Sequence, residues 1–144
     1  MTPQHRATRC ADAMWANDLA SQSLGIRVDH IGPGQATLSM PVRADMLNGH
    51  GICHGGMIFT LADSAFAFAC NTYNRITVAQ QNQITYLSPG QPGETLTATA
   101  TETARQGRSG TYDVTVTGGD GRTVALFRGL SRTISGTHFD EDQP

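Results

Sequence analysis

The residues best suited to chemistry lie in one stretch, from Asn48 to Asn71, which reads NGHGICHGGMIFTLADSAFAFACN. It opens with glycines, histidines and a cysteine, and continues from about Gly55 as an apolar run that contains one carboxylate, Asp63. A buried carboxylate needs a partner, a raised pKa or a task, and a raised pKa makes it a better base. The glycines could present free backbone amides to a developing negative charge.

The glycine amides and Asp63 must be held in place by a helix or a strand. The apolar run predicts a buried central helix over residues 54 to 72. The run is too long for a typical strand and is apolar on nearly every side. It is also shorter than a membrane span and carries a charge at its middle, so we expect no membrane partner. The start of such a helix, at Gly55 and Gly56, would offer unpaired amides and the positive end of the helix dipole.

The remaining segments predict one further helix and several strands. Residues 10–23 place Met14, Trp15 and Leu19 within two turns of a short amphipathic helix. Turns rich in glycine and proline separate the strand candidates, which are residues 26–30, 36–42, 77–87, 95–104, 111–117 and 123–134. Within the strand at 95–101 the small side chains share one face, which leaves room for a helix against the sheet.

Together these elements predict an α+β fold, in which a long central helix is wrapped by an antiparallel sheet of about five to six strands after a short N-terminal helix. We expect residues 1–144 to form a single domain whose core covers about 11–134. The polar ends, residues 1–9 and the tail after Ser135, are expected to be flexible.

Composition excludes some classes of partner. The net charge is −2 and 15% of the residues are charged, which predicts no nucleic-acid binding. All ten basic residues are arginine, a residue suited to binding phosphate bidentately. The three cysteines are irregularly spaced and no secretory signal is evident, so we expect reduced thiols and a cytoplasmic location.

Several motifs together resemble the hotdog thioesterase superfamily, and more narrowly its phenylacetate-degradation (PaaI-type) acyl-CoA thioesterases. The matching segments are Met46-Leu47-Asn48-Gly49-His50, Cys53-His54-Gly55-Gly56, Leu61-Ala62-Asp63, Ile84-Thr85-Tyr86-Leu87-Ser88-Pro89-Gly90 and Thr123-Val124-Ala125-Leu126-Phe127-Arg128-Gly129. The resemblance implies a hotdog fold and hydrolysis of acyl-CoA thioesters without a cofactor. It favours aryl-acetyl or hydroxylated phenylacetyl groups, with short or medium aliphatic chains as open alternatives.

The resemblance also implies residue roles. Asp63 would be the catalytic carboxylate, as base or nucleophile, and the amide of Gly55 would polarise the thioester carbonyl. Asn48 and His54 would shape and orient the site, and Gly56 would let the acyl group approach closely.

One position departs from the family pattern. Some relatives carry a serine that assists the attacking water, and Ala79 stands there in this chain. That role is therefore absent or supplied by a neighbour, for which Thr77 and Gln80 are candidates. Arg105 and Arg108 are candidates for contacts to the CoA phosphates. Arg128 and Arg132, which share one face of the last strand, are weaker candidates of the same kind.

If Gly55 and Asp63 act on one thioester, their spacing requires a second chain. Gly55 and Asp63 are 63 − 55 = 8 residues apart, or about 12 Å along a helix. One carbonyl carbon cannot lie within about 3 Å of both, so the spacing predicts a two-fold dimer with antiparallel helices and shared active sites. The resemblance adds the expectation of a dimer of dimers.

Other interpretations stay open. Asp63 could be a structural carboxylate with a polar neighbour. His50, Cys53 and His54 match no zinc signature, so we expect no bound metal. Instead of an enzyme, the chain could be a non-catalytic acyl-CoA-binding module. A hotdog dehydratase or hydratase is a further alternative that the motifs fit less well.

Overall fold

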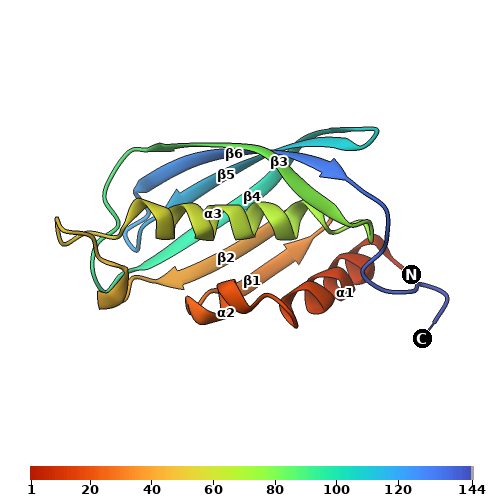
Figure 1. Cartoon of the computed structure of the whole chain (residues 1–144), viewed down its shortest axis with the longest axis horizontal. Helices are drawn as coiled ribbons and strands as arrows, with labels where there is room; N and C mark the ends of the chain where they lie inside the picture. Colours follow the sequence, from red (N-terminus) through yellow and green to blue (C-terminus); the bar gives the residue numbers. More distant parts are fainter. Residues whose placement is uncertain (144) are drawn as a thin grey trace.

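A long helix, α3 (Gly55–Cys70), lies across one face of an antiparallel sheet (Figure 1). The computed structural model describes residues 1–143. The elements before α3 are α1 (Pro3–Trp15), α2 (Leu19–Ser23), β1 (Arg27–Gly32), β2 (Gln35–Pro41) and a 3-10 turn, η1 (Ala44–Met46). Those after it are β3 (Thr77–Tyr86), β4 (Thr95–Gln106), β5 (Ser109–Thr117) and β6 (Thr123–Thr133). The six predicted strands are confirmed to within two residues at each end.

The six strands are ordered β1-β2-β4-β5-β6-β3, so β1 and β3 form the two edges of the sheet. The β1 edge is covered by α1, whose residue Gln4 donates a side-chain hydrogen bond to the carbonyl of Ile31 at 2.7 Å. The β3 edge pairs with β6 on one side, and its other side has no strand partner within residues 1–143. An open edge of this kind is available for pairing with another chain.

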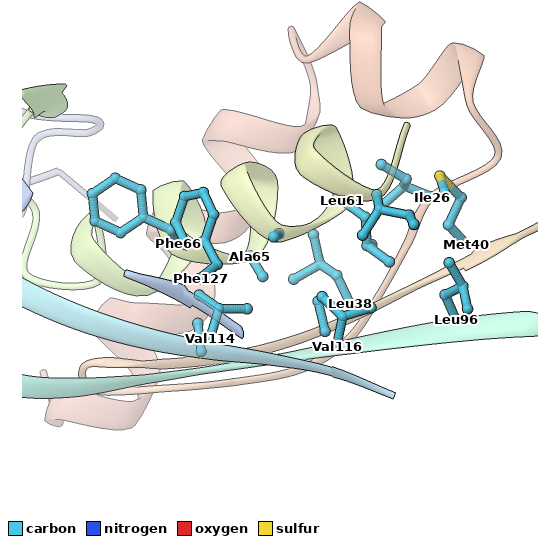
Figure 2. Packing of buried hydrophobic residues seen from close by; sticks show 14 of the residues in the cluster. Ile26, Leu38, Met40, Leu61, Ala65, Phe66, Leu96, Val114, Val116 and Phe127 are labelled. Carbon is cyan, nitrogen blue, oxygen red and sulfur yellow. The ribbon is translucent and has the colours of Figure 1, made fainter. Parts of the chain in front are cut away.

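The core lies between α3 and the sheet (Figure 2). Leu96, Ala98 and Ala100 point inward from β4 and are fully buried, which confirms that small residues on this strand make room for the helix. Opposite them, Phe66 of α3 lies over Gly129 of β6, where an added Cβ would come within 2.7 Å of the ring. Glycine at this position therefore allows the helix to approach the sheet closely.

The N-terminal part differs from the sequence prediction. The first helix begins at Pro3 instead of residue 10, and it ends at Trp15, with α2 as a separate short helix. Thr2 caps the start of α1 by accepting a hydrogen bond from the amide of His5 at 3.1 Å, and Pro3 suits the first turn. Ala7 is fully buried. The expectation of a flexible segment over residues 1–9 was therefore wrong.

The C-terminal tail is also packed, against the prediction. Asn74 donates a hydrogen bond to the carbonyl of Phe139 at 3.0 Å, and Arg6 of α1 pairs with Glu141 at 2.6 Å. The guanidinium of Arg9 lies 4.0 Å from the centre of the Phe139 ring. A few specific tertiary contacts hold this polar segment, and such contacts leave no periodic pattern in the sequence.

The central helix is slightly shorter than predicted, because His54 and Asn71 cap it instead of belonging to it. Within residues 1–143, none of the helices has the length and apolar character needed to cross a membrane. Cys10, Cys53 and Cys70 are all buried and free of disulfides.

Candidate active site

The start of α3 is organised by His54. Its Nδ1 accepts a hydrogen bond from the amide of Gly56 at 2.9 Å, so His54 is the N-cap of the helix. Because Nδ1 accepts, it carries no proton, and the ring proton is on Nε2. The backbone amide of His54 donates to the carbonyl of Met46 at 2.8 Å, which ties the cap to the preceding turn.

The amide of Gly55, one residue further, makes no hydrogen bond among residues 1–143. Its carbonyl accepts a hydrogen bond from the hydroxyl of Tyr86 on β3 at 2.9 Å. A Cβ at position 55 would lie 3.2 Å from the Tyr86 ring. Gly55 thus presents a free amide at a helix N-terminus, where the helix dipole favours negative charge.

Asn48 shapes the loop that leads to this helix. Its Oδ1 accepts hydrogen bonds from the amides of His50 at 2.9 Å and Ile52 at 3.4 Å. Leu47, just before Asn48, forms an isolated β-bridge with Cys53, just after Ile52. Within one chain Asn48 therefore acts on its own loop, and the expected role in shaping the site is compatible with these contacts.

Asp63 lies two turns along α3 from Gly55 and is half-buried. Its Oδ1 accepts a hydrogen bond from the side-chain amide of Asn82 on β3 at 3.1 Å. Burial raises the pKa of Asp63, and the Asn82 hydrogen bond opposes that rise. Because α3 is continuous from Gly55 to Cys70, the separation of about 12 Å between Gly55 and Asp63 holds in the fold.

The other predicted residues lie mostly at the far end of α3. Thr77, Arg105 and Arg108 line one cavity of about 1120 Å³, between the end of α3, the β4–β5 turn and the C-terminal tail. Arg105 is stacked on the ring of Tyr73, with its guanidinium 3.4 Å from the ring centre. Gln80 is exposed at the bulge in β3 and lies outside the residues that line this cavity.

Arg128 and Arg132, the weaker candidates for phosphate contacts, do not line this cavity. Arg128 forms an ion pair with Asp113 at 2.7 Å, on the face of the sheet opposite α3. Arg132 is exposed on the same strand face. No three His, Cys, Asp or Glu side chains among residues 1–143 are placed to hold a metal ion.

Sequence reasoning missed two side chains that touch the key groups, Asn82 and Tyr86. Both belong to β3, where they lie on the same face as the inward-pointing Ile84. The alternation of a strand could have shown that these residues face the helix. However, a bulge between Ala79 and Gln81 shifts the alternation, so counting from the start of β3 gives the wrong face.

The fold and this site define a hotdog-type protein, in which the central helix carries the carboxylate of Asp63 and the free amide of Gly55. Residues 50–125 match the family model of the thioesterase superfamily, and the chain belongs to this family. It is 46% identical over 133 residues to the acyl-coenzyme A thioesterase PaaI of Escherichia coli K12, covering 92% of this chain and 95% of that protein. The family and fold predicted from the motifs are thereby confirmed.

Solved structures agree. The E. coli PaaI protein from the phenylacetic acid degradation operon superposes with a TM-score of 0.93 at 45% identity, covering 94% of this chain and 99% of that one. The TT0310 protein of Thermus thermophilus has a TM-score of 0.79 at 41% identity, covering 82% of this chain and 99% of the other.

Proposed function

We propose that this thioesterase hydrolyses acyl-CoA thioesters to a free acid and CoA. The observation that carries this proposal is the free amide of Gly55 at the start of a helix that also holds the half-buried Asp63. An amide so placed can stabilise the oxyanion of a tetrahedral intermediate, and a carboxylate of raised pKa can act as base or nucleophile. The similarity to an acyl-coenzyme A thioesterase supports the same substrate class.

The reaction follows from these two groups. Water attacks the thioester carbon while Asp63 takes its proton, and the Gly55 amide donates a hydrogen bond to the carbonyl oxygen as it becomes negative. The intermediate then collapses, the carbon–sulfur bond breaks, and the departing sulfur takes the proton from Asp63. In the alternative route Asp63 attacks the carbon directly, the carbon–sulfur bond breaks and CoA leaves as the thiolate. Water then hydrolyses the resulting mixed anhydride to the free acid and the Asp63 carboxylate, and the proton released goes to the thiolate.

Each site needs two subunits, because about 12 Å of helix separates Gly55 from Asp63 in one chain. The open edge of β3 supports a two-fold dimer in which the two β3 edges pair and the α3 helices run antiparallel. Such a dimer places the Gly55 end of one helix beside Asp63 of the other. We extend the proposal to a pair of dimers on the basis of the family.

A mixed dimer tests this arrangement. One chain carries Asp63→Asn and the other Gly55→Val, for which the exposed Tyr86 ring must move aside. Each mutant homodimer is expected to be nearly inactive. In the mixed dimer one site collects both changes and the other collects neither, so activity returns to about half of wild type per dimer. Confirmed heterodimers without recovery would contradict shared sites.

The CoA end of the substrate is proposed to reach the cavity lined by Thr77, Arg105 and Arg108. This cavity opens at the C-terminal end of α3, toward which the antiparallel partner helix would direct its Gly55 end. Its arginines suit the phosphates of CoA, and its hydroxyl groups suit hydrogen bonding. The free thiols of all three cysteines support the cytoplasmic location expected from the sequence.

The acyl group is proposed to be hydroxyphenylacetyl or phenylacetyl, with short and medium aliphatic chains as competitors. Purified protein assayed with a panel of these CoA esters, with thiol detection, ranks the acyl groups by kcat/KM. The same acyl groups on pantetheine, which lacks the nucleotide, measure the contribution of the phosphates. Tight binding of CoA esters without turnover would favour the non-catalytic binding module, and hydration of an enoyl-CoA would favour the hydratase.

A further inference from the structure

Asn82 is the one residue of the strands whose side chain hydrogen-bonds to Asp63 within residues 1–143. It lies on β3 directly opposite Gly129 of β6. Gly129 is the position where Phe66, one turn beyond Asp63, lies against the strand backbone. The same close approach of helix and sheet therefore brings the Asn82 amide within 3.1 Å of the carboxylate.

The environment of Asn82 is not explained by packing. Its Oδ1 is buried and has no hydrogen-bond partner among residues 1–143. A buried acceptor left without a partner costs about 1–3 kcal/mol, and such groups in folded proteins call for an explanation. Two positions along the same face of β3, an isoleucine, Ile84, packs against the core. A similar apolar residue at 82 would avoid the unpaired oxygen but would leave Asp63 without its donor.

We propose that Asn82 is a positioning residue for Asp63, fixing one carboxylate oxygen through its Nδ2 so that the other is directed toward the thioester. This inference rests on the proposed function, and it assigns Asn82 a role in orienting the carboxylate of Asp63. The donor also favours the ionised form of Asp63, which is the form that can accept a proton or attack the carbonyl.

Few charged groups surround Asp63 within residues 1–143, and the proposed dimer adds the Gly55 end of the partner helix. On α3 itself, burial raises the pKa of the Cys70 thiol, and the negative charge of Asp63 raises it further. At the start of α2 the carboxylate of its N-cap residue, Asp18, accepts a hydrogen bond from Ser21, which in turn contacts Ser64, the neighbour of Asp63. The facing strands contribute the neutral amide of Asn82.

The test is Asn82→Leu, which keeps the side-chain size and removes the donor. We expect kcat to fall roughly tenfold or more, because a hydrogen bond to a charged group is lost, with little change in KM. The acidic limb of the pH profile of kcat/KM is expected to move to higher pH, because the pKa of Asp63 rises without the donor. Gln83→Leu, the same change on the opposite face of β3, is the control and should leave rate and profile unchanged.

A second variant, Asn82→Asp, guards against misfolding of the leucine variant, because it is nearly the same shape as the native residue. It replaces the donor by a second carboxylate, so the acidic limb is expected to move further upward. An acidic limb that superimposes on wild type in both variants, or an equal loss in Gln83→Leu, would overturn the proposal.

Carboxyl ¹³C NMR of Asp63 separates this inference from the proposed function. The pKa of Asp63 should be higher in Asn82→Leu than in wild type, whichever substrate the enzyme uses. If wild type hydrolyses none of the CoA esters but the carboxyl titration shifts as expected, the function is wrong while the Asn82–Asp63 pairing stands. An unshifted titration in a folded variant rejects the pairing itself.

Discussion

At its C-terminal end α3 is enclosed by side chains that bind the backbone, whereas at its N-terminal end one amide stays free. Asn71 donates to the carbonyls of Ala67 at 2.8 Å and Thr77 at 2.9 Å, and accepts from the Thr77 amide at 2.9 Å. Thr72 donates to Ala69 at 3.0 Å and accepts from the Gly34 amide at 2.8 Å. The other end keeps the cap at His54 but leaves Gly55 unpaired.

This difference contrasts polar groups that hold the fold together with the groups that we propose act on the substrate. Asn71 and Thr72 are almost fully buried, and their donors and acceptors bind other parts of the same chain. The free amide of Gly55 and the half-buried Asp63 have fewer partners than their positions allow, which is typical of groups reserved for a ligand. Substitutions of Asn71 or Thr72 should accordingly lower the stability, whereas substitutions of Gly55 or Asp63 should lower the turnover.

The largest effect is expected at Asp63, in the middle of α3. Asp63→Asn should lower kcat by at least ~10²-fold, the usual size for loss of a general base or nucleophile. The protein should stay folded and still bind CoA esters, because asparagine preserves the shape and Asp63 holds no structural ion pair within residues 1–143. Steady-state kinetics and circular dichroism measure both. Asp45→Asn, an exposed carboxylate on η1, is the control, and near-normal turnover by Asp63→Asn would remove this residue from the mechanism.

At the C-terminal end of α3 a substitution should lower the stability and leave kcat nearly unchanged. Asn71→Leu removes the acceptor of the Thr77 amide and the donor to the carbonyls of Ala67 and Thr77, so the free energy of unfolding should fall by about 2–4 kcal/mol. The kcat of the folded fraction should stay close to wild type. Urea unfolding and kinetics at low temperature measure the two quantities. A loss of kcat as large as that of Asp63→Asn would show that the two ends are not separate.

The smallest expected effect is the loss of stability at acidic pH that His138 causes. Burial lowers the pKa of His138, which hydrogen-bonds to Asn71 at 2.8 Å, so folding favours the neutral form of this histidine. Between its folded pKa and the ordinary value of about 6.5, the unfolded chain binds more protons, so acidification favours unfolding. Stability should therefore fall as the pH drops below about 6.5, and less so in His138→Gln, which keeps a donor but cannot titrate. Urea unfolding at neutral and acidic pH measures the difference, and identical losses would contradict it.

The sequence alone determined the main architecture and the family. The apolar run around Asp63 predicted the central helix, and the alternation of small and polar residues predicted β4 against it. The glycine pair before the run predicted the helix start that the structure contains. These predictions succeeded because periodicity and glycine placement are local consequences of burial and backbone geometry.

Tertiary structure decided which groups meet. The contact of Asn82 with Asp63 depends on a bulge in β3, which has no local signal, and on Gly129, whose place in the sequence does not show which side chain approaches it. The packed tail and the helix at residues 3–15 likewise depend on contacts between distant segments, such as Arg6 with Glu141. A sequence pattern reports what each segment buries, whereas the partner that each polar atom finds is fixed only when the segments come together.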